Sequence, residues 1–568
     1  MMQHPPKPRT MIPSSEPLMK DPKTAHTSLP LAITALLLGA CAPTSDEPPN
    51  ASSGQVKTVV VGKMSAYAAA RAADQVSFGA TPALVNDLAQ NELPGWIDAQ
   101  MALPVSRIDS PPWVVDYNRD DPTAQNRAFR FVPESFYRMA LTAPDQLRLR
   151  VSWALMQFIP VNSKVDPFGQ AEHFNLLQRH AFGNYSSFLR ELSVAPAMGW
   201  FLDNQSNRPL SSQCPDCSPN ENYARELMQL FSLGVVKINA DGTPLRDAQG
   251  KVQETYSQKD VEELARALTG WRFAPSAVPL PSTNWINAGQ AMVPDDWAPA
   301  HDRGAKTVLG TTFPADREAP QELDTAVATL MAHPNIAPFV SLRLIQHLVT
   351  SNPTPQYLGR VAAAFRNNGR GVTGDMKAVV RAVLLDAEAR RGDVPGVDGA
   401  RFGKLREPVL FYTAALRGLS CTAPLNWGDG NLLGLPPQQP FGPASVFSFF
   451  LPTDRAPGSN LLAPEQKLLT TDELTQRLGR LTWTLTGDGA RANTQSGCDV
   501  VALGQAFAQS HKAFVDLVSA RWFRGAMPPT LRSNLLALAA SQTWNSPDEG
   551  AFKLMQYALS TPYFGVIK

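Results

Sequence analysis

The chain has 568 residues, of which 43% are hydrophobic and 18% charged, as in an ordinary globular protein with one or more buried cores. Its 51 Lys and Arg residues balance 50 Asp and Glu residues, so the formal charge of +1 provides no basic field for nucleic acid. Composition therefore excludes a disordered polymer and gives no support for nucleic-acid binding. The 50 prolines gather in segments such as 275–284 and 434–443, which predicts long, stiff surface loops.

The first element along the chain is an apolar run of about a dozen residues within 28–41, too short to span a bilayer. We interpret residues 1–40 as an export signal peptide, with Met19 as an alternative start because Lys20 supplies the charged segment that precedes the apolar run. The run ends in Leu-Gly-Ala-Cys, which resembles the bacterial lipobox, so Cys41 is the expected lipidation site. Cleavage elsewhere, leaving the protein free of lipid, is the alternative.

Residues 41–64 are rich in Pro, Ser, Ala and Asn and are expected to form a flexible, lipidated tether. The lipid would anchor the protein to a membrane without spanning it. The expected location is the bacterial cell envelope, facing the periplasm. The absence of Asp directly after Cys41 favours the outer membrane.

From about residue 65 onward the apolar residues recur at helical spacing. In one segment Asp375 is a candidate N-cap, followed by a buried stripe of Met376, Val379, Val380, Val383 and Leu384. Similar patterns occupy 143–159, 323–332 and 337–349. Strand-like alternation is confined to 306–310 and to the arms of a small hairpin at 239–252. We therefore predict a mainly α fold, a single multi-helix globular domain over 65–568 with long Pro-rich loops and a few short β-hairpins.

Two polar segments predict capped helices. In 218–234, Ser218 and Glu221 fit a capping box, and Gly234 is placed to end the helix. A helical wheel puts Tyr223, Leu227, Leu230 and Phe231 on the buried side, and Glu221, Asn222, Arg225, Glu226 and Gln229 on the polar side. In 257–271, Ser257 and Asp260 form a similar cap before a buried stripe.

The cysteines other than Cys41 are Cys214, Cys217, Cys421 and Cys498. Export to an oxidising compartment favours disulfides between them. If Cys214 and Cys217 form a local pair, the other two remain to pair with each other, but the sequence leaves three pairings open. Redox or metal use of Cys214 and Cys217, or free thiols, are alternatives.

Several longer segments resemble the bacterial domain of unknown function 1800 family. They are "SPNENYARELMQLFSLGV" at 218–235, "TYSQKDVEELARALTGW" at 255–271 and "HDRGAKTVLG" at 301–310, together with 75–101, 145–157, 179–207, 404–419 and 445–466. The resemblance implies a mostly helical, exported protein, identified as a lipoprotein member of the family. It also implies a partner, because family members are often encoded beside secreted proteins of family 1501, which resemble sulfatases and alkaline phosphatases. The paired cysteines at 214 and 217 depart from the family pattern.

The residues that match the family's polar signatures are the candidate site. They are Asn220, Glu221, Asn222, Arg225, Glu226, His301, Asp302 and Lys306. Carboxylates with an imidazole suit a divalent metal or acid–base chemistry, so a metal-dependent or acid–base hydrolase of an envelope polymer is one hypothesis. Spacing along the chain does not bring residues 221 and 301 together, and His301 with Asp302 can equally cap a turn before the strand at 306–310. The favoured hypothesis is a tethered protein that binds or positions the sulfatase-like partner.

Two further features have a structural and a functional interpretation. His180 is placed to cap a helix C-terminus, with catalysis as the alternative. The aromatic segment 446–452 is core in one interpretation and the wall of an apolar groove for a glycan, lipid or peptide in the other. No serine-hydrolase elbow, zinc-protease helix, P-loop or dinucleotide-binding motif occurs in the sequence, so no cofactor is evident.

Overall fold

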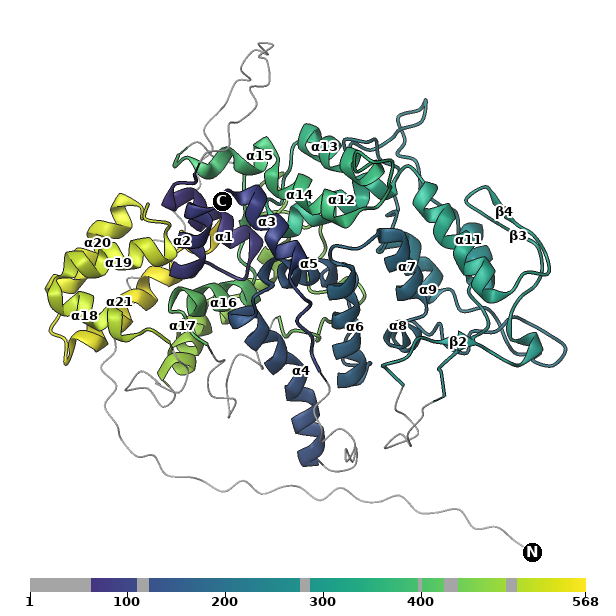
Figure 1. Cartoon of the computed structure of the whole chain (residues 1–568), viewed down its shortest axis with the longest axis horizontal. Coiled ribbons are helices and arrows are strands. Elements are labelled where there is room, and N and C mark those ends of the chain that lie inside the picture. The colour runs from purple at the N-terminus through teal and green to yellow at the C-terminus, as the bar shows by residue number, and fades with distance from the viewer. Residues whose placement is uncertain (1–62, 110–121, 276–286, 397–400, 423–437, 487–497) are drawn as a thin grey trace, which may run out of the picture. The chain divides into compact units, whose positions relative to one another are not determined.

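The computed structural model describes residues 63–109, 122–275, 287–396, 401–422, 438–486 and 498–568 (Figure 1). The expected signal peptide, Cys41 and nearly all of the tether lie outside these residues, as do most of 275–284 and part of 434–443. The described residues belong to one compact unit, Val59–Lys568.

The prediction of a mainly α fold is confirmed. In the first half of the chain the helices are α1 (Ala66–Val76), α2 (Pro82–Gln90), α3 (Leu93–Ala102), α4 (Pro122–Thr142), α5 (Gln146–Met156), α6 (Pro167–His180), α7 (Tyr185–Ser193), α8 (Pro196–Phe201), α9 (Asn222–Gln229) and α10 (Gln258–Ala267). In the second half they are α11 (Ala319–Ala332), α12 (Ile336–Leu348), α13 (Pro355–Arg366), α14 (Met376–Leu385), α15 (Ala387–Arg390), α16 (Pro408–Gly418), α17 (Thr471–Thr486), α18 (Val501–Gln509), α19 (His511–Trp522), α20 (Pro529–Ser541) and α21 (Pro547–Ser560). Short 3-10 turns are η2 (Ala298–Ala300), η3 (Arg391–Asp393) and η5 (Pro464–Leu468).

The described strands form only two-stranded antiparallel ladders. They pair β1 (Trp271–Arg272) with β2 (Val293–Pro294), β3 (Lys306–Val308) with β4 (Thr311–Phe313), and β5 (Lys404–Leu405) with β6 (Val566–Ile567). The strand predicted at 306–310 is therefore confirmed. The arms of the hairpin predicted at 239–252 meet only at isolated bridges, such as Arg246 with Val252.

The core is built around helices that are buried on all sides. Every residue of α5 and α16 is buried, and α5 packs against α3, α6 and α12. The indole of Trp153 on α5 donates a 2.6 Å hydrogen bond to the carboxylate of Glu407, just before α16. The stripe predicted on α14 is buried as expected, and Asp375 caps the helix through the backbone N–H groups of Lys377 and Ala378. The last helices, α18–α21, pack against one another (yellow in Figure 1).

The two polar segments fold differently. The capping box of α10 is present, because the Ser257 hydroxyl accepts from Asp260 N–H and the Asp260 carboxylate accepts from Ser257 N–H. The box predicted at Ser218 is wrong, because α9 begins only at Asn222. The carboxylate of Glu221 binds Arg225 instead of a backbone N–H, and the side-chain oxygen of Asn220 accepts from Asn222 N–H at 2.9 Å.

The structure contains two disulfides, Cys214–Cys217 and Cys421–Cys498. Of the three pairings left open by the sequence, it is the local one that forms. The first bridge lies in the loop that leads into α9, and that loop is also held by a 2.7 Å hydrogen bond from Asn220 N–H to the Asn207 side chain. This double restraint explains the late start of α9, since the loop residues are already fixed in a turn.

Candidate functional site

The first candidate residues lie at the start of α9. Glu221 Oε2 is 2.7 Å from an Arg225 guanidinium nitrogen, and Gln258 of α10 bonds to both side chains, at 2.9 Å to Glu221 and 3.0 Å to Arg225. These three side chains are partly exposed and satisfy one another. The arrangement fixes α9 against the beginning of α10, which is a structural role.

Glu226 differs from its neighbours. The wheel placed it on the polar face, but its side chain is buried. Burial raises the pKa of its carboxyl to about 7, opposed by the nearby charge of Arg225. Its Oε2 has no hydrogen-bond partner. Glu226 is therefore a buried carboxyl that titrates near neutral pH, the property needed in a general acid or base.

The second set of candidates meets beyond the other end of α10, where the chain passes from Thr269 through Gly270. Gly270 has φ +84°, and a Cβ on it would lie 2.7 Å from the Cβ of His301, so only glycine allows His301 this close. The His301 Nδ1 then lies 2.9 Å from the Thr269 carbonyl oxygen. Asp302 accepts from Gly304 N–H at 2.9 Å, so it caps a turn before β3 as one interpretation expected.

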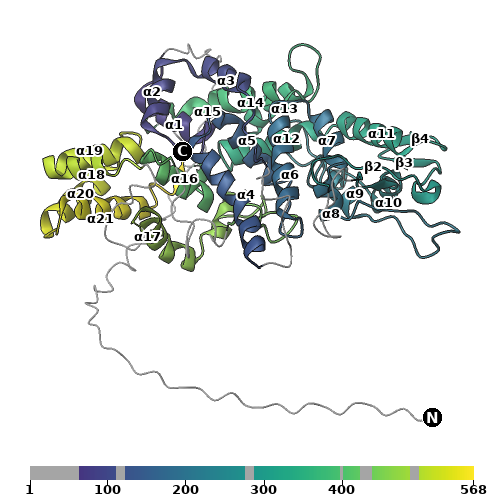
Figure 2. The ribbon, with the colours of Figure 1, turned by 60° about the horizontal axis from the view of Figure 1, so that its bottom comes forward.

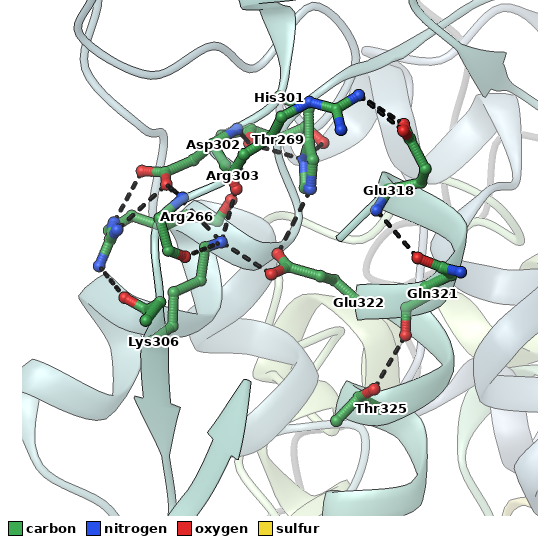
Figure 3. A network of polar contacts seen from close by, with 12 residues as sticks. Arg266, Thr269, His301, Asp302, Arg303, Lys306, Glu318, Gln321, Glu322 and Thr325 are labelled. Atoms are coloured by element: carbon green, nitrogen blue, oxygen red, sulfur yellow. Dashed lines mark hydrogen bonds and ion pairs between the residues drawn. The ribbon is translucent and has the colours of Figure 1, made fainter. Parts of the chain in front are cut away.

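We call Arg266, His301, Asp302, Lys306 and Glu322 the His301 cluster (Figure 3). The guanidinium of Arg266 binds both carboxylate oxygens of Asp302, at 2.7 and 3.0 Å. The Lys306 ammonium is fully buried and donates to Glu322 Oε1 at 2.8 Å, and His301 Nε2 lies 3.4 Å from Glu322 Oε2. The cluster therefore joins α10, the turn before β3 and α11, with its opposite charges paired.

The structure does not bring the two sets together. Glu221 contacts Gln258, the first residue of α10, whereas Asp302 contacts Arg266, near its last turn. Eight residues of helix separate these two contacts by about 12 Å. Figure 2 shows α9 and α10 next to each other, below β3 and α11 in that view, and α10 contacts all three of these elements. Residues 221–226 and 301–306 thus form two sites.

No group of three or more His, Cys, Asp and Glu side chains in the described ranges is arranged to hold a metal ion. None of the helices that the structure describes combines the length and apolar composition needed to cross a membrane.

A third site is an apolar pocket of about 210 Å³ that we call the aromatic pocket. Its wall comes from the end of α5, the end of α9 with the following turn, α12, and the loop 446–453. Phe339, Arg343 and His347 lie one turn apart on α12, and the spacing of four residues places them on one face. The segment 446–452 therefore lines a pocket, as one of its two interpretations expected.

The charges in the aromatic pocket are unusual. His347 is buried and its ring stacks on Phe158 at 6.3 Å between centroids. Burial, with the positive charges of Lys404, Arg343 and Arg150, lowers the pKa of His347 well below its ordinary value, so the ring is neutral at pH 7. The guanidinium of Arg343 lies 5.1 Å from the Phe339 centroid and bonds to the Gln346 side chain at 2.7 Å.

His180 is the last residue of α6, as predicted. Its Nε2 lies 2.6 Å from Glu191 Oε2, and this hydrogen bond, with Arg179, lowers the pKa of Glu191 to about 2. The pair ties α6 to α7, so His180 has a structural role at a helix end.

The comparison with family models decides the family. The model described as Protein of unknown function (DUF1800) matches residues 71–566. The chain belongs to this family. The DUF1800 match covers the His301 cluster, Glu226 and the whole aromatic pocket, so all three are parts of the family domain. Comparisons with the curated proteins and with solved structures give no match.

Several residues of these DUF1800 sites were not predicted from the sequence, among them Arg266, Glu322, Arg343 and His347. Glu322 is an acid within an amphipathic helix, where the ordinary expectation is a solvent-exposed face. Arg343 and His347 stand in the segment 337–349, of which only the helical pattern was recognised. An arginine four residues before a histidine on an otherwise apolar helix was the available signal.

Proposed function

We propose that this protein is an exported, lipid-anchored envelope protein that binds and positions a secreted partner, with the sulfatase-like proteins of family 1501 as the expected partner. The observation that carries the proposal is the aromatic pocket and its apolar rim. Val235, Phe447 and Leu451 line the pocket and are 52%, 41% and 43% exposed. Large apolar side chains gathered at one pocket are typical of interaction sites.

The polar candidates support binding over catalysis. In the His301 cluster, Lys306 and Arg266 are each paired with a carboxylate, so no charged group there is available without breaking an ion pair. Glu221 is likewise held by Arg225. The apolar rim, by contrast, has no partner within the described chain that covers it.

The membrane anchor and the partner are tested separately. Cys41→Ala should move the protein from the membrane fraction to the soluble periplasmic fraction, and a variant still membrane-bound after a salt wash contradicts the anchor. For the partner, the protein is co-expressed with a protein of family 1501, and the stoichiometry of the complex is measured by native mass spectrometry. Leu451→Ser should reduce complex formation at least about tenfold.

The matched control is Val372→Ser, because Val372 is also 43% exposed but does not line the pocket. It should leave the complex intact. The proposed partner binding is contradicted if both variants weaken the complex equally. It is also contradicted if the wild-type protein forms no stoichiometric complex.

Glu226 favours a second candidate function, an acid–base or metal-dependent hydrolase of an envelope polymer. Its pKa of about 7 and its unpartnered oxygen suit proton transfer at neutral pH. The test incubates purified protein, with and without added divalent metal, with cell-wall polysaccharide and peptidoglycan. Turnover that Glu226→Gln abolishes supports this function, and turnover unchanged by Glu226→Gln contradicts it.

A further inference from the structure

The size of the aromatic pocket limits what enters it. Its volume of about 210 Å³ is below the range of about 300–1,000 Å³ typical of pockets for drug-sized ligands. Phe158, Phe339 and Phe450 supply aromatic wall, and Phe450 lies 6.2 Å from His347 between centroids. The space inside the pocket therefore suits one apolar side chain or a short acyl group.

The charge of the pocket selects an anion. Arg343 forms no ion pair with any carboxylate in the described part of the chain, and its pKa is lowered to about 10 by burial alone, so it stays charged at neutral pH. Lys404, by contrast, is paired with Glu465 at 3.2 Å. His347 is neutral. One uncompensated guanidinium beside an apolar wall favours a ligand with a single negative charge.

Two buried polar atoms indicate what else the ligand carries. The side-chain oxygen of Gln157 and Nδ1 of His347 are buried without a hydrogen-bond partner, and both residues line the pocket. A buried acceptor without a donor is destabilising, and a ligand that donates to it recovers this cost. The carboxamide oxygen of Gln157 needs an N–H or O–H donor. A simple fatty acid has no such donor beside its carboxylate.

We infer that the aromatic pocket binds the C-terminal residue of a polypeptide that ends in an apolar side chain. The free α-carboxylate pairs with Arg343, and the apolar side chain enters among the phenylalanines. The Gln157 carboxamide turns toward the pocket and accepts from the backbone N–H of the ligand. This inference rests on the proposed partner binding and deepens it, because it states which end of the partner is recognised.

The test uses the full-length purified protein in detergent and a fluorescein-labelled hexapeptide of glycine and alanine that ends in leucine. Fluorescence anisotropy measures Kd for the free acid, for the C-terminal amide of the same peptide, and for octanoate as competitor. The acid should bind at least about tenfold more tightly than the amide. Arg343→Gln should abolish this difference while leaving amide binding unchanged.

Arg370→Gln is the matched control, because Arg370 is exposed and lies outside the pocket, and it should leave the preference for the acid intact. The inference is overturned if the acid and the amide bind equally well or if neither binds. It is also overturned if octanoate competes as strongly as the unlabelled peptide acid. Because the peptide assay contains no partner protein, its failure is distinct from failure of the co-expression experiment, which tests the proposed function itself.

Discussion

The buried ion pair of Lys306 and Glu322 is the most stringent test of the structural role of the His301 cluster. Both side chains are almost completely buried, and the Lys306 ammonium donates to Glu322 at 2.8 Å and to the backbone carbonyls of Asp302 and Gly304 at 2.5 and 2.8 Å. Lys306→Met removes all three contacts and leaves a buried carboxylate without its cation. Breaking such a pair from one side costs about 3–5 kcal/mol in unfolding free energy.

Urea unfolding followed by tryptophan fluorescence measures this cost. The double variant Lys306→Met with Glu322→Leu lacks both charges. Its loss in unfolding free energy should therefore be smaller, by about 1–3 kcal/mol, than the sum of the losses in the two single variants. Arg303→Met is the control, because Arg303 and Glu318 form an exposed 2.7 Å pair worth at most about 1 kcal/mol. A Lys306→Met variant no less stable than Arg303→Met would refute the reasoning.

Three further outcomes follow from single features. The pKa of Glu226 in the folded protein, about 7, lies above its ordinary value of 4.5. The protonated carboxyl therefore stabilises the fold fully below pH 4.5, and this stabilisation is lost as the pH rises through 7. Urea midpoints at pH 5 and 8 should show a loss in unfolding free energy of the order of 1 kcal/mol, which Glu226→Gln should remove. Gly234→Ala should destabilise by about 1–3 kcal/mol, since Gly234 has φ +75° and a Cβ there would lie 2.8 Å from the Phe339 ring; an unchanged urea midpoint contradicts this. Replacing Cys421 and Cys498 by alanine should cost about 4 kcal/mol, because their bridge spans 77 residues, and an unaltered urea midpoint refutes that.

Much of the fold was predictable because helical periodicity and caps are local. The buried stripe on α14 and the capping box of α10 follow from residues within one or two turns of each other. The start of α9 was not predictable in this way. There Asn207, which precedes Asn220 by thirteen residues, together with the Cys214–Cys217 bridge, fixes the loop, so contacts outside the helix override the local capping signal at Ser218.

The candidate sites were predictable only in part. His301, Asp302 and Lys306 are close in sequence, and they also meet in space. Glu322, the partner of His301 and Lys306, comes from α11 and has no sequence signal of its own. Glu226 was placed on the polar face because a helix wheel contains no information about which helix packs over it. Glu226 is nevertheless buried, so contacts from outside α9 decide its environment.

The pairing of charged side chains separates the His301 cluster from the aromatic pocket in this DUF1800 domain. Where charges are paired, as in Lys306 with Glu322, binding of a metal ion or a proton shuttle would first have to break an ion pair that holds α11 to β3. In the aromatic pocket the reverse holds. Arg343 has no carboxylate partner in the described chain, and Gln157 keeps a buried acceptor without a donor. A buried acceptor without a donor costs about 1–3 kcal/mol, which a donating ligand recovers. The pocket is therefore where recognition of a partner should be sought, whereas Glu226, whose Oε2 also has no partner, is the group to test for catalysis.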